Sequence, residues 1–225
     1  MVKLVFFCRR RPDIDHGTYV KRLLEGHVPL ALRHHPTLRR YTVNIVDEAS
    51  PGSPSLDSIG ELWFDSLDDY RERLYDSVEG ERQIARDVAG FLGAADAYVT
   101  TEHVQRAPAK PDHLGEPSAG IKFIAAVRRA EGLTHDQFVA GWLEHHVPLV
   151  LADPRVRGYK TNVVEASLSA DAAAYDGIAE LYFDSATDLD AHIQMSRDER
   201  QPIRADIQRF VSRAVTYRAR EYIER

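Results

Sequence analysis

The sequence predicts an α+β fold in which two ferredoxin-like βαββαβ modules close their sheets into one barrel. Two observations carry this prediction. The segment His27–Leu30, which reads His-Val-Pro-Leu, returns 119 residues later as His146–Leu149. Around both copies the same order of strand-like and helix-like patterns recurs, so the chain of 225 residues holds one module twice.

The first half opens with a strand and a helix. Residues 3–9 are rich in Val and Phe, as in a buried strand. Asp15 is a candidate N-cap for the helix that follows it. That helix has an apolar stripe at helical spacing, made of Val20, Leu23, Leu24 and His27. Pro29 has no N–H to bond the carbonyl of Glu25, so the helix is expected to stop or kink just after His27.

The rest of the first half completes the βαββαβ order. The predicted elements are strands at 38–46, 59–65 and 95–102 and helices at 67–75 and 81–91. Between the first two of these strands lies the turn-rich loop Ser50–Ser55. On the strand at 59–65, Leu62 shares one face with Phe64, and Glu61 shares the other with Trp63.

A linker separates the two halves. Residues 104–119 contain three prolines and a glycine among charged side chains. We therefore expect modules at 1–103 and 120–225. In the second module Thr134 and Gln137 have capping-box spacing, and the stripe of the first helix is repeated.

Two copies in one chain solve a packing problem. The helices of a βαββαβ sheet cover one of its faces, and the other face must be buried against something. A second copy on a short linker supplies that partner at high effective concentration. The expected result is a pseudo-two-fold barrel with a cleft between sheet and helices in each half. The sequence leaves open whether this intramolecular pair also forms a homodimer.

Composition narrows the classes of partner. A net charge of −6 and a pI near 5.9 argue against nucleic-acid binding, which usually needs a basic face. Cys8 is the single cysteine and sits in an apolar run, which favours inert packing in a reducing compartment. The apolar start of the chain is too short for a membrane span or an ordinary signal peptide. We expect a cytoplasmic protein that acts on a small molecule.

The motifs of both halves together resemble a known family. They are the apolar Lys-Leu-Val-Phe-Phe start, the His-Val-Pro-Leu segments, Tyr-x-x-Asn on the second strand, and Glu-Leu-Trp/Tyr-Phe-Asp-Ser from Glu61 and from Glu180. Their order and spacing, seen twice, resemble the EthD family of the dimeric α+β barrel superfamily. The resemblance covers almost all of both halves, leaving out the linker. A tandem copy departs from the single-module form that is common in the family.

The resemblance implies a function class. The family is named for a component of ether degradation, and its relatives include aromatic polyketide cyclases, muconolactone isomerases and fungal dehydratases. Such relatives usually work without metal or organic cofactor, so we expect none here. In the family pattern the histidine of His-x-Pro is the usual acid/base candidate, which corresponds to His27 and His146. More distant members of the superfamily bind haem or oxidise small aromatic compounds.

The two histidines are the first catalytic candidates. Imidazole suits proton transfer near neutral pH. The alternative is a core histidine that bonds a carbonyl freed near the proline. Both readings stay open for His27 and His146, and the repetition favours function. Asp87 and Asp206 are expected in helix capping or a salt bridge.

Eight further residues are candidates for substrate binding. They are Tyr41, Asn44, Glu61, Trp63, Tyr159, Asn162, Glu180 and Tyr182. The Tyr and Asn side chains would bind a substrate oxygen, and Trp63 with Tyr182 would form an aromatic wall. The alternative for Glu61 and Glu180 is an ion pair with Lys3 or Lys122 on a neighbouring strand. For the others the alternative is packing within the core.

A metal site is not expected. His34 stands seven residues after His27, and Asp153 stands in the same relation to His146. Pro29 interrupts the helical register, however, and no third ligand has clear spacing.

Three functions remain to be weighed. The leading hypothesis is cofactor-independent acid/base catalysis of the cyclase, isomerase or dehydratase type on a hydrophobic, aromatic or polyketide-like substrate. The first alternative is a non-catalytic carrier or sensor of hydrophobic small molecules. The second is haem- or oxygen-dependent monooxygenase-like chemistry, which rests on superfamily analogy alone. The sequence names neither the substrate nor the active half.

Overall fold

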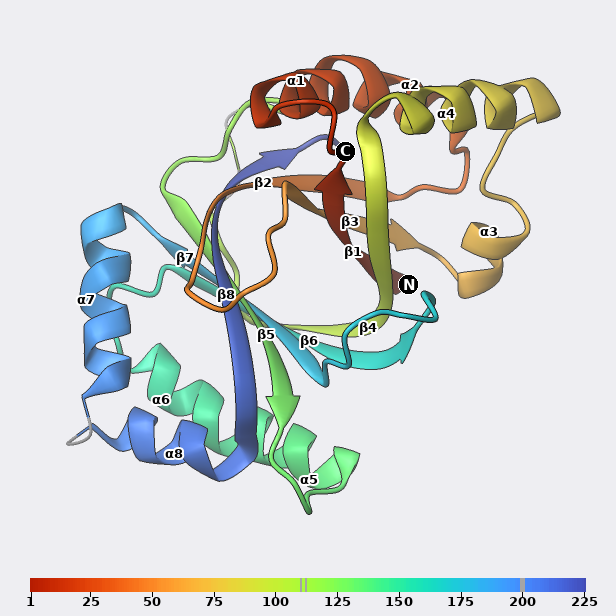
Figure 1. Cartoon of the computed structure of the whole chain (residues 1–225). Coiled ribbons are helices and arrows are strands. Elements are labelled where there is room, and N and C mark those ends of the chain that lie inside the picture. The colour runs from red at the N-terminus through yellow and green to blue at the C-terminus, as the bar shows by residue number, and fades with distance from the viewer. Residues whose placement is uncertain (110, 112, 199–200) are drawn as a thin grey trace.

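The strands form one closed barrel in the order β1-β3-β2-β8-β5-β7-β6-β4 (Figure 1). The computed structural model describes residues 1–109, 111, 113–198 and 201–225. All strand pairs in the barrel are antiparallel. None of the helices in these ranges is both long and apolar enough to cross a membrane.

Each half contributes four strands and its own helices. The first half has β1 (Val2–Arg10), α1 (His16–Lys21), a π-helical segment (Arg22–His27), α2 (Val28–His34), β2 (Arg40–Ala49), β3 (Ser58–Phe64), α3 (Leu67–Arg71), α4 (Val78–Phe91) and β4 (Leu92–Arg106). The second has β5 (Ile121–Arg129), α5 (His135–Ala140), a π-helical segment (Gly141–His146), α6 (Val147–Leu151), β6 (Gly158–Ser167), β7 (Gly177–Phe183), α7 (Ala186–Arg197), α8 (Pro202–Phe210) and β8 (Val211–Ile223).

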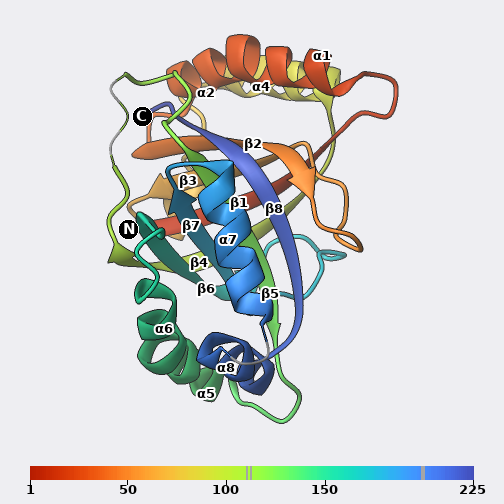
Figure 2. The ribbon, with the colours of Figure 1, turned by 90° about the vertical axis from the view of Figure 1, so that its left-hand side faces the viewer.

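The two sheets have the same ferredoxin-like order and meet at two seams. The first sheet runs β4-β1-β3-β2 and the second runs β8-β5-β7-β6. β2 pairs with β8 at one seam, and β4 pairs with β6 at the other. Helices α1, α2 and α4 cover the outer face of the first sheet, and α5, α6 and α8 lie at the opposite side of the barrel (Figures 1 and 2). The predicted fold class is confirmed.

Two predicted boundaries need correction. β4 continues to Arg106 and pairs with β6 as far as Tyr159, so the strand extends into the segment expected to be linker. The reason is that a seam strand gains hydrogen bonds from the partner sheet for as long as that sheet runs beside it. In the opposite sense, the helix predicted at 67–75 ends at Arg71. Residues 110 and 112 of the predicted linker lie outside the described residues.

The helix that carries the repeated histidine does not stop after it. In each half a π-helical turn ends at the histidine, and an α-helix continues directly from it with the proline in its first turn. The wider turn changes the hydrogen-bond register, with the N–H of Val28 bonded to the carbonyl of Leu23. The chain can therefore pass the missing N–H of Pro29 without breaking the helix.

Apolar side chains form three clusters, one inside the barrel and one under each helical layer. The cluster inside the barrel includes Phe7, whose ring contacts the rings of Tyr98 and Tyr217. The other two lie between each sheet and its own helices and include Tyr19 and Phe91 in the first half and Trp142 and Phe210 in the second. Each sheet is therefore buried on both faces, as the duplication requires.

Next to the apolar cluster, the barrel interior holds a square of four buried charges. Lys3 Nζ lies 2.7 Å from Glu61 Oε2 and 2.5 Å from Glu180 Oε1. Lys122 Nζ lies 2.6 Å from Glu61 Oε1 and 2.8 Å from Glu180 Oε2. Each lysine thus contacts a carboxylate of its own module and one of the other module. The ion-pair alternative for Glu61 and Glu180 is the arrangement found.

Neighbouring polar groups complete this charge square. Asn44 and Asn162 donate to Glu61 and Glu180 at 2.6 and 2.7 Å, and Glu102 and Glu221 accept from Lys3 and Lys122 at 3.0 Å. Burial alone would lower the pKa of Lys3, but Glu180 and the other carboxylates hold that pKa above its ordinary value. The pKa of Glu180, which burial alone would raise, is held well below its ordinary value by Lys122 and Lys3.

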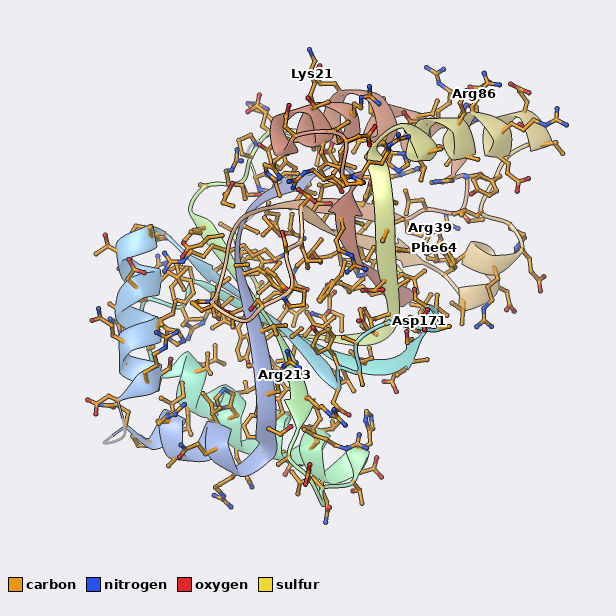
Figure 3. The ribbon with its side chains drawn as sticks, in the orientation of Figure 1. Lys21, Arg39, Phe64, Arg86, Asp171 and Arg213 are labelled. Atoms are coloured by element: carbon orange, nitrogen blue, oxygen red, sulfur yellow. The ribbon has the colours of Figure 1, made fainter. Side chains whose placement is uncertain are left out.

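We expect Lys3→Met to lower the free energy of unfolding by about 3–5 kcal/mol, because it leaves buried carboxylates without their cation. Urea denaturation measures this change. The matched control is Arg39→Met, since Arg39 makes an exposed ion pair with Asp65 at 2.5 Å and is labelled in Figure 3. That variant should lose less than about 1 kcal/mol.

Adding Glu180→Gln to Lys3→Met should cost less than the sum of the two single changes, because it removes one of the stranded charges. A Lys3→Met variant no less stable than Arg39→Met would contradict the structural role given to the charge square.

Candidate functional site

A cleft lies between sheet and helices in each half, and the repeated histidine lines it. The first cleft has a volume of about 270 Å³ and is lined by His27, among others. The second has a volume of about 480 Å³ and is lined by His146. Both open on the outer side of the barrel wall, so the predicted clefts are present in both halves.

His146 is held by an aspartate on the facing helix. Its Nδ1 lies 3.0 Å from Asp206 Oδ2, and its ring packs against Phe210 with the centroids 5.0 Å apart. A carboxylate can only accept a hydrogen bond, so Nδ1 carries the hydrogen and Nε2 keeps its lone pair. No described residue hydrogen-bonds this Nε2. The geometry gives the second cleft a positioned base.

The first half repeats this pair. His27 Nδ1 lies 2.9 Å from Asp87 Oδ2, and its ring lies 5.4 Å from the centroid of Phe91. Asp87 and Asp206, expected in helix capping or a salt bridge, instead accept hydrogen bonds from the candidate histidines. The sequence did not indicate this pairing, since each aspartate stands 60 residues after its histidine and on another helix.

Burial sets the protonation state of His146. The side chain is 8% exposed, and this burial lowers its pKa below the ordinary value of about 6.5. The hydrogen bond and charge of Asp206 act in the opposite direction, and the charge of His192 lowers the pKa further. The imidazole is therefore neutral at pH 7, which is the form that accepts a proton.

A second imidazole lines the cleft of the second half. His192 on α7 is 5% exposed, and its Nδ1 lies 2.8 Å from Asp153 Oδ2. Arg155 donates to both oxygens of the same aspartate at 2.8 and 3.0 Å. Burial lowers the pKa of His192, so this ring is also neutral at pH 7. Asp153 therefore hydrogen-bonds His192. It does not pair with His146, with which the sequence spacing suggests a metal site.

Sequence reasoning missed His192 because it has no counterpart in the first half. The residue 119 positions earlier is Arg73, whose side chain is 65% exposed. α7 runs to Arg197, whereas the corresponding α3 ends at Arg71. A search for repeated residues cannot find a group that only one copy carries. The sequence holds only one indication of His192, namely a single histidine within a segment of helical pattern.

The predicted tyrosines line the clefts. Tyr41 is in the first cleft and Tyr159 in the second. Tyr159 accepts a hydrogen bond from Trp142 Nε1 at 2.9 Å. Trp142 fits because position 177 is glycine, where a Cβ would lie 2.2 Å from Cζ3 of the indole ring. These side chains form the aromatic wall of the second cleft.

The other six predicted binding residues lie on the opposite face of the sheet. They are Glu61 and Glu180, which belong to the charge square inside the barrel, and Asn44, Trp63, Asn162 and Tyr182, which lie around it. Side chains alternate across a strand, so Asn44 and Tyr41, three residues apart, must point to opposite sides. Trp63 and Tyr182 lie beside the lysines, with Lys3 Nζ 4.7 Å from the Trp63 ring centroid. The structure therefore brings neither ring into a cleft.

A family model for the EthD domain matches the sequence twice, over residues 11–95 and 130–214. The chain belongs to the EthD family. The two matches begin 119 residues apart, the spacing of the repeated histidines, so the predicted tandem duplication is confirmed.

Solved structures share the fold of the paired EthD domains. An anthrone oxidase-like protein aligns with a TM-score of 0.68 at 11% identity, over 99% of this chain and 92% of its own. A putative monooxygenase from Fusobacterium nucleatum aligns with a TM-score of 0.60 at 6% identity, over 100% of this chain and 92% of its own. A putative chlorite dismutase aligns with a TM-score of 0.53 at 8% identity, over 97% of this chain and 93% of its own. At these identities the likeness shows the fold alone. The search of curated proteins finds no match.

Loops of each EthD domain cross the seam and bond to the other domain. The loop after β2 in the first domain crosses the β2–β8 seam, where Ser50 N donates to Thr216 O at 2.9 Å. Ser50 and Pro51 thereby line the cleft of the second domain. In the other direction, Leu168 N donates to Ala97 O at 2.8 Å. The cleft of the second domain is therefore built from both domains.

The cleft of the first EthD domain is less polar. Burial lowers the pKa of its His35 to about 4 and raises the pKa of the Cys8 thiol to about 12. Neither group is charged at neutral pH, and a thiol with that pKa is a poor nucleophile. This agrees with the inert role expected for Cys8.

We expect Asp206→Asn to lower the pKa of His146 further, because the carboxylate raises that pKa through its charge and hydrogen bond. An NMR titration of the histidine ring signals measures this without a substrate. Asp87→Asn is the matched control, since it changes the equivalent pair of the other domain and should leave the His146 curve unchanged. A His146 pKa that rises in Asp206→Asn would contradict the electrostatic account.

Proposed function

We propose that the cleft of the second EthD domain catalyses cofactor-independent proton transfer on a hydrophobic or aromatic small molecule. The reaction would be of the cyclase, isomerase or dehydratase type. The observation that carries the proposal is the neutral His146, oriented by Asp206 and facing a cleft of about 480 Å³ with its Nε2 free of described partners. Its family supports a small-molecule enzyme.

The chemistry begins with removal of a proton from carbon. His146 Nε2 takes the proton next to a substrate carbonyl, and the C–H electron pair moves into an enolate. The resulting imidazolium is stabilised by Asp206. The enolate then either regains a proton at another carbon, expels a hydroxide that leaves as water, or attacks a second carbonyl of the same molecule. Each course returns the proton from His146 and needs no oxidant or reductant.

His192 is the second proton-transfer group of this proposal. It lines the same cleft, and Asp153 fixes its Nδ1–H in the same way that Asp206 fixes that of His146. Its Nε2 can accept a proton in one half of the reaction and return it in the other. Isomerases and dehydratases need a proton removed at one atom and delivered at another, which two imidazoles can divide between them.

The second cleft is favoured over the first for three reasons. It is larger, its second imidazole His192 is bonded to a carboxylate whereas His35 of the first cleft contacts the carbonyl of Leu74, and its repeated histidine is the more buried of the two. The first cleft keeps His27 with Asp87 and serves as the internal comparison. His27 stays a predicted catalytic residue, but we assign the main reaction to His146.

Deuterium exchange tests this proposal directly. A panel of aromatic β-keto acids, hydroxy ketones and lactones is incubated with the protein in D₂O, and loss of the signal of the proton next to the carbonyl is followed by NMR. We expect His146→Ala to lower the rate for an accepted compound about 100-fold or more, and His27→Ala to change it less than about threefold. Equal losses in both variants, or none, would overturn the assignment.

The same measurement separates the alternatives. A compound that binds the second cleft and shows neither exchange nor product would favour a non-catalytic carrier, for which the apolar lining of the cleft is the supporting observation. A visible spectrum taken after haem addition tests the haem-dependent alternative, and a Soret band would favour it.

A further inference from the structure

We propose that the cleft of the second EthD domain selects a ligand with a carboxylate on a hydrophobic ring system, and that Arg204 and Arg197 bind the carboxylate. This inference deepens the proposed function by naming the class of substrate. The residues that bind the carboxylate differ from the residues that transfer protons. Each role can therefore be tested without the other.

Arg204 is a half-buried cation that lines the cleft, and no described residue is its hydrogen-bond or ion-pair partner. It lies in α8 two residues before Asp206 and lines the second cleft. Its Nε is buried and has no hydrogen-bond partner among the described residues. A buried donor left unpaired costs free energy, which a ligand oxygen would recover. The arginine side chain offers further N–H groups in the same plane, which suits a carboxylate with its two oxygens.

Arg197 provides a second cation at the same cleft. It is the last residue of α7, its side chain is exposed, and it lines the cleft together with Arg204. Among the residues that the structure describes, no carboxylate forms an ion pair with either arginine. The described residues that line this cleft include no Asp, Glu or Lys. The aspartates behind the wall, Asp206 and Asp153, are already bonded to the two imidazoles.

The local charge is therefore opposite to that of the whole protein. The chain carries a net charge of −6, yet the second cleft presents two guanidinium groups and neutral imidazoles. A charged group in a partly enclosed site interacts with a ligand more strongly than a solvated surface charge does. An anionic group is thus the favoured occupant of this end of the cleft.

The first EthD domain lacks both features and so acts as an internal reference. The residue equivalent to Arg204 is Ala85, next to Ile84, just as Arg204 stands next to Ile203. The residues lining the first cleft include no Arg, Lys, Asp or Glu. The duplicated domains thus share the histidine–aspartate pair and differ in the charge that surrounds it. The difference assigns the selection of an anion to the second domain.

The aromatic and apolar side chains of the second cleft indicate what the rest of the ligand is like. The wall of the second cleft includes Phe123, Trp142, Tyr159 and Phe210. Such a wall buries a flat, hydrophobic body, while a few polar groups fix its orientation. With its carboxylate at the arginines and its ring against this wall, a ligand would lie beside His146 and His192.

A matched pair of ligands tests this inference. 2-Naphthoate and 2-naphthamide share one ring system and differ in charge. The chain has two tryptophans, so the indole N–H signal of Trp142 reports on the second cleft and that of Trp63 on the barrel interior. We expect naphthoate to shift the Trp142 signal and to bind at least about tenfold more tightly than naphthamide.

Substitution of the arginines should remove this preference. Arg204→Met should lower the affinity for naphthoate at least about tenfold and change that for naphthamide less than about threefold, with a larger loss in Arg197→Met/Arg204→Met. Arg209→Met is the control, because Arg209 is an exposed residue of the same helix and its loss changes the net charge equally. That variant should keep the preference. Thermal unfolding by circular dichroism checks that each variant is folded.

The outcomes separate this inference from the proposed function. A naphthoate preference that disappears in Arg204→Met supports the inference even if no compound undergoes exchange. Equal affinity for the two ligands in the unmodified protein, or a preference that survives the double substitution, overturns it. Exchange on neutral compounds without any preference for acids would leave the acid/base proposal standing and would refute the assignment to the arginines.

Discussion

The square of Lys3, Lys122, Glu61 and Glu180 is the interaction on which the rest of the structure depends. Within the square each lysine bonds one carboxylate from each module, so the square fixes how the two sheets face one another. Burying four charges costs a large desolvation free energy, and an apolar filling could be equally stable. What the charges add is register, because a sheet shifted by one residue would place them on the outer face and leave partners unpaired.

This use of the barrel interior determines where chemistry can take place. The polar residues inside the barrel are engaged with one another, and the candidate acid/base groups lie on the outer faces, between sheet and helices. Duplication supplied both domains with the same histidine–aspartate pair. The second domain has His192 and two arginines at its cleft, whereas the first has a lining without charged side chains. One copy can therefore maintain the barrel while the other specialises.

The sequence predicted the fold well because the repeat and the alternation of side chains are local signals. It placed His27 and His146 together with Tyr41 and Tyr159 at the clefts, but it did not tell which sheet face lies inside a barrel. Alternation assigns faces only relative to one another, so Glu61 was grouped with residues of the other face. The aspartate partners depend on how α4 and α8 lie over the preceding helices, 60 residues away.

In this account the barrel interior holds the fold together while ligands bind in the outer clefts. A crystal structure of the protein soaked with 2-naphthoate would test this central division most directly. The account predicts a closed barrel with the lysine–glutamate square intact and the ring against Trp142 in the second cleft. The carboxylate would lie at Arg204, and the ring would be within reach of His146. Ligand density inside the barrel in place of the charge square, or a ligand bound only in the first cleft, would contradict it.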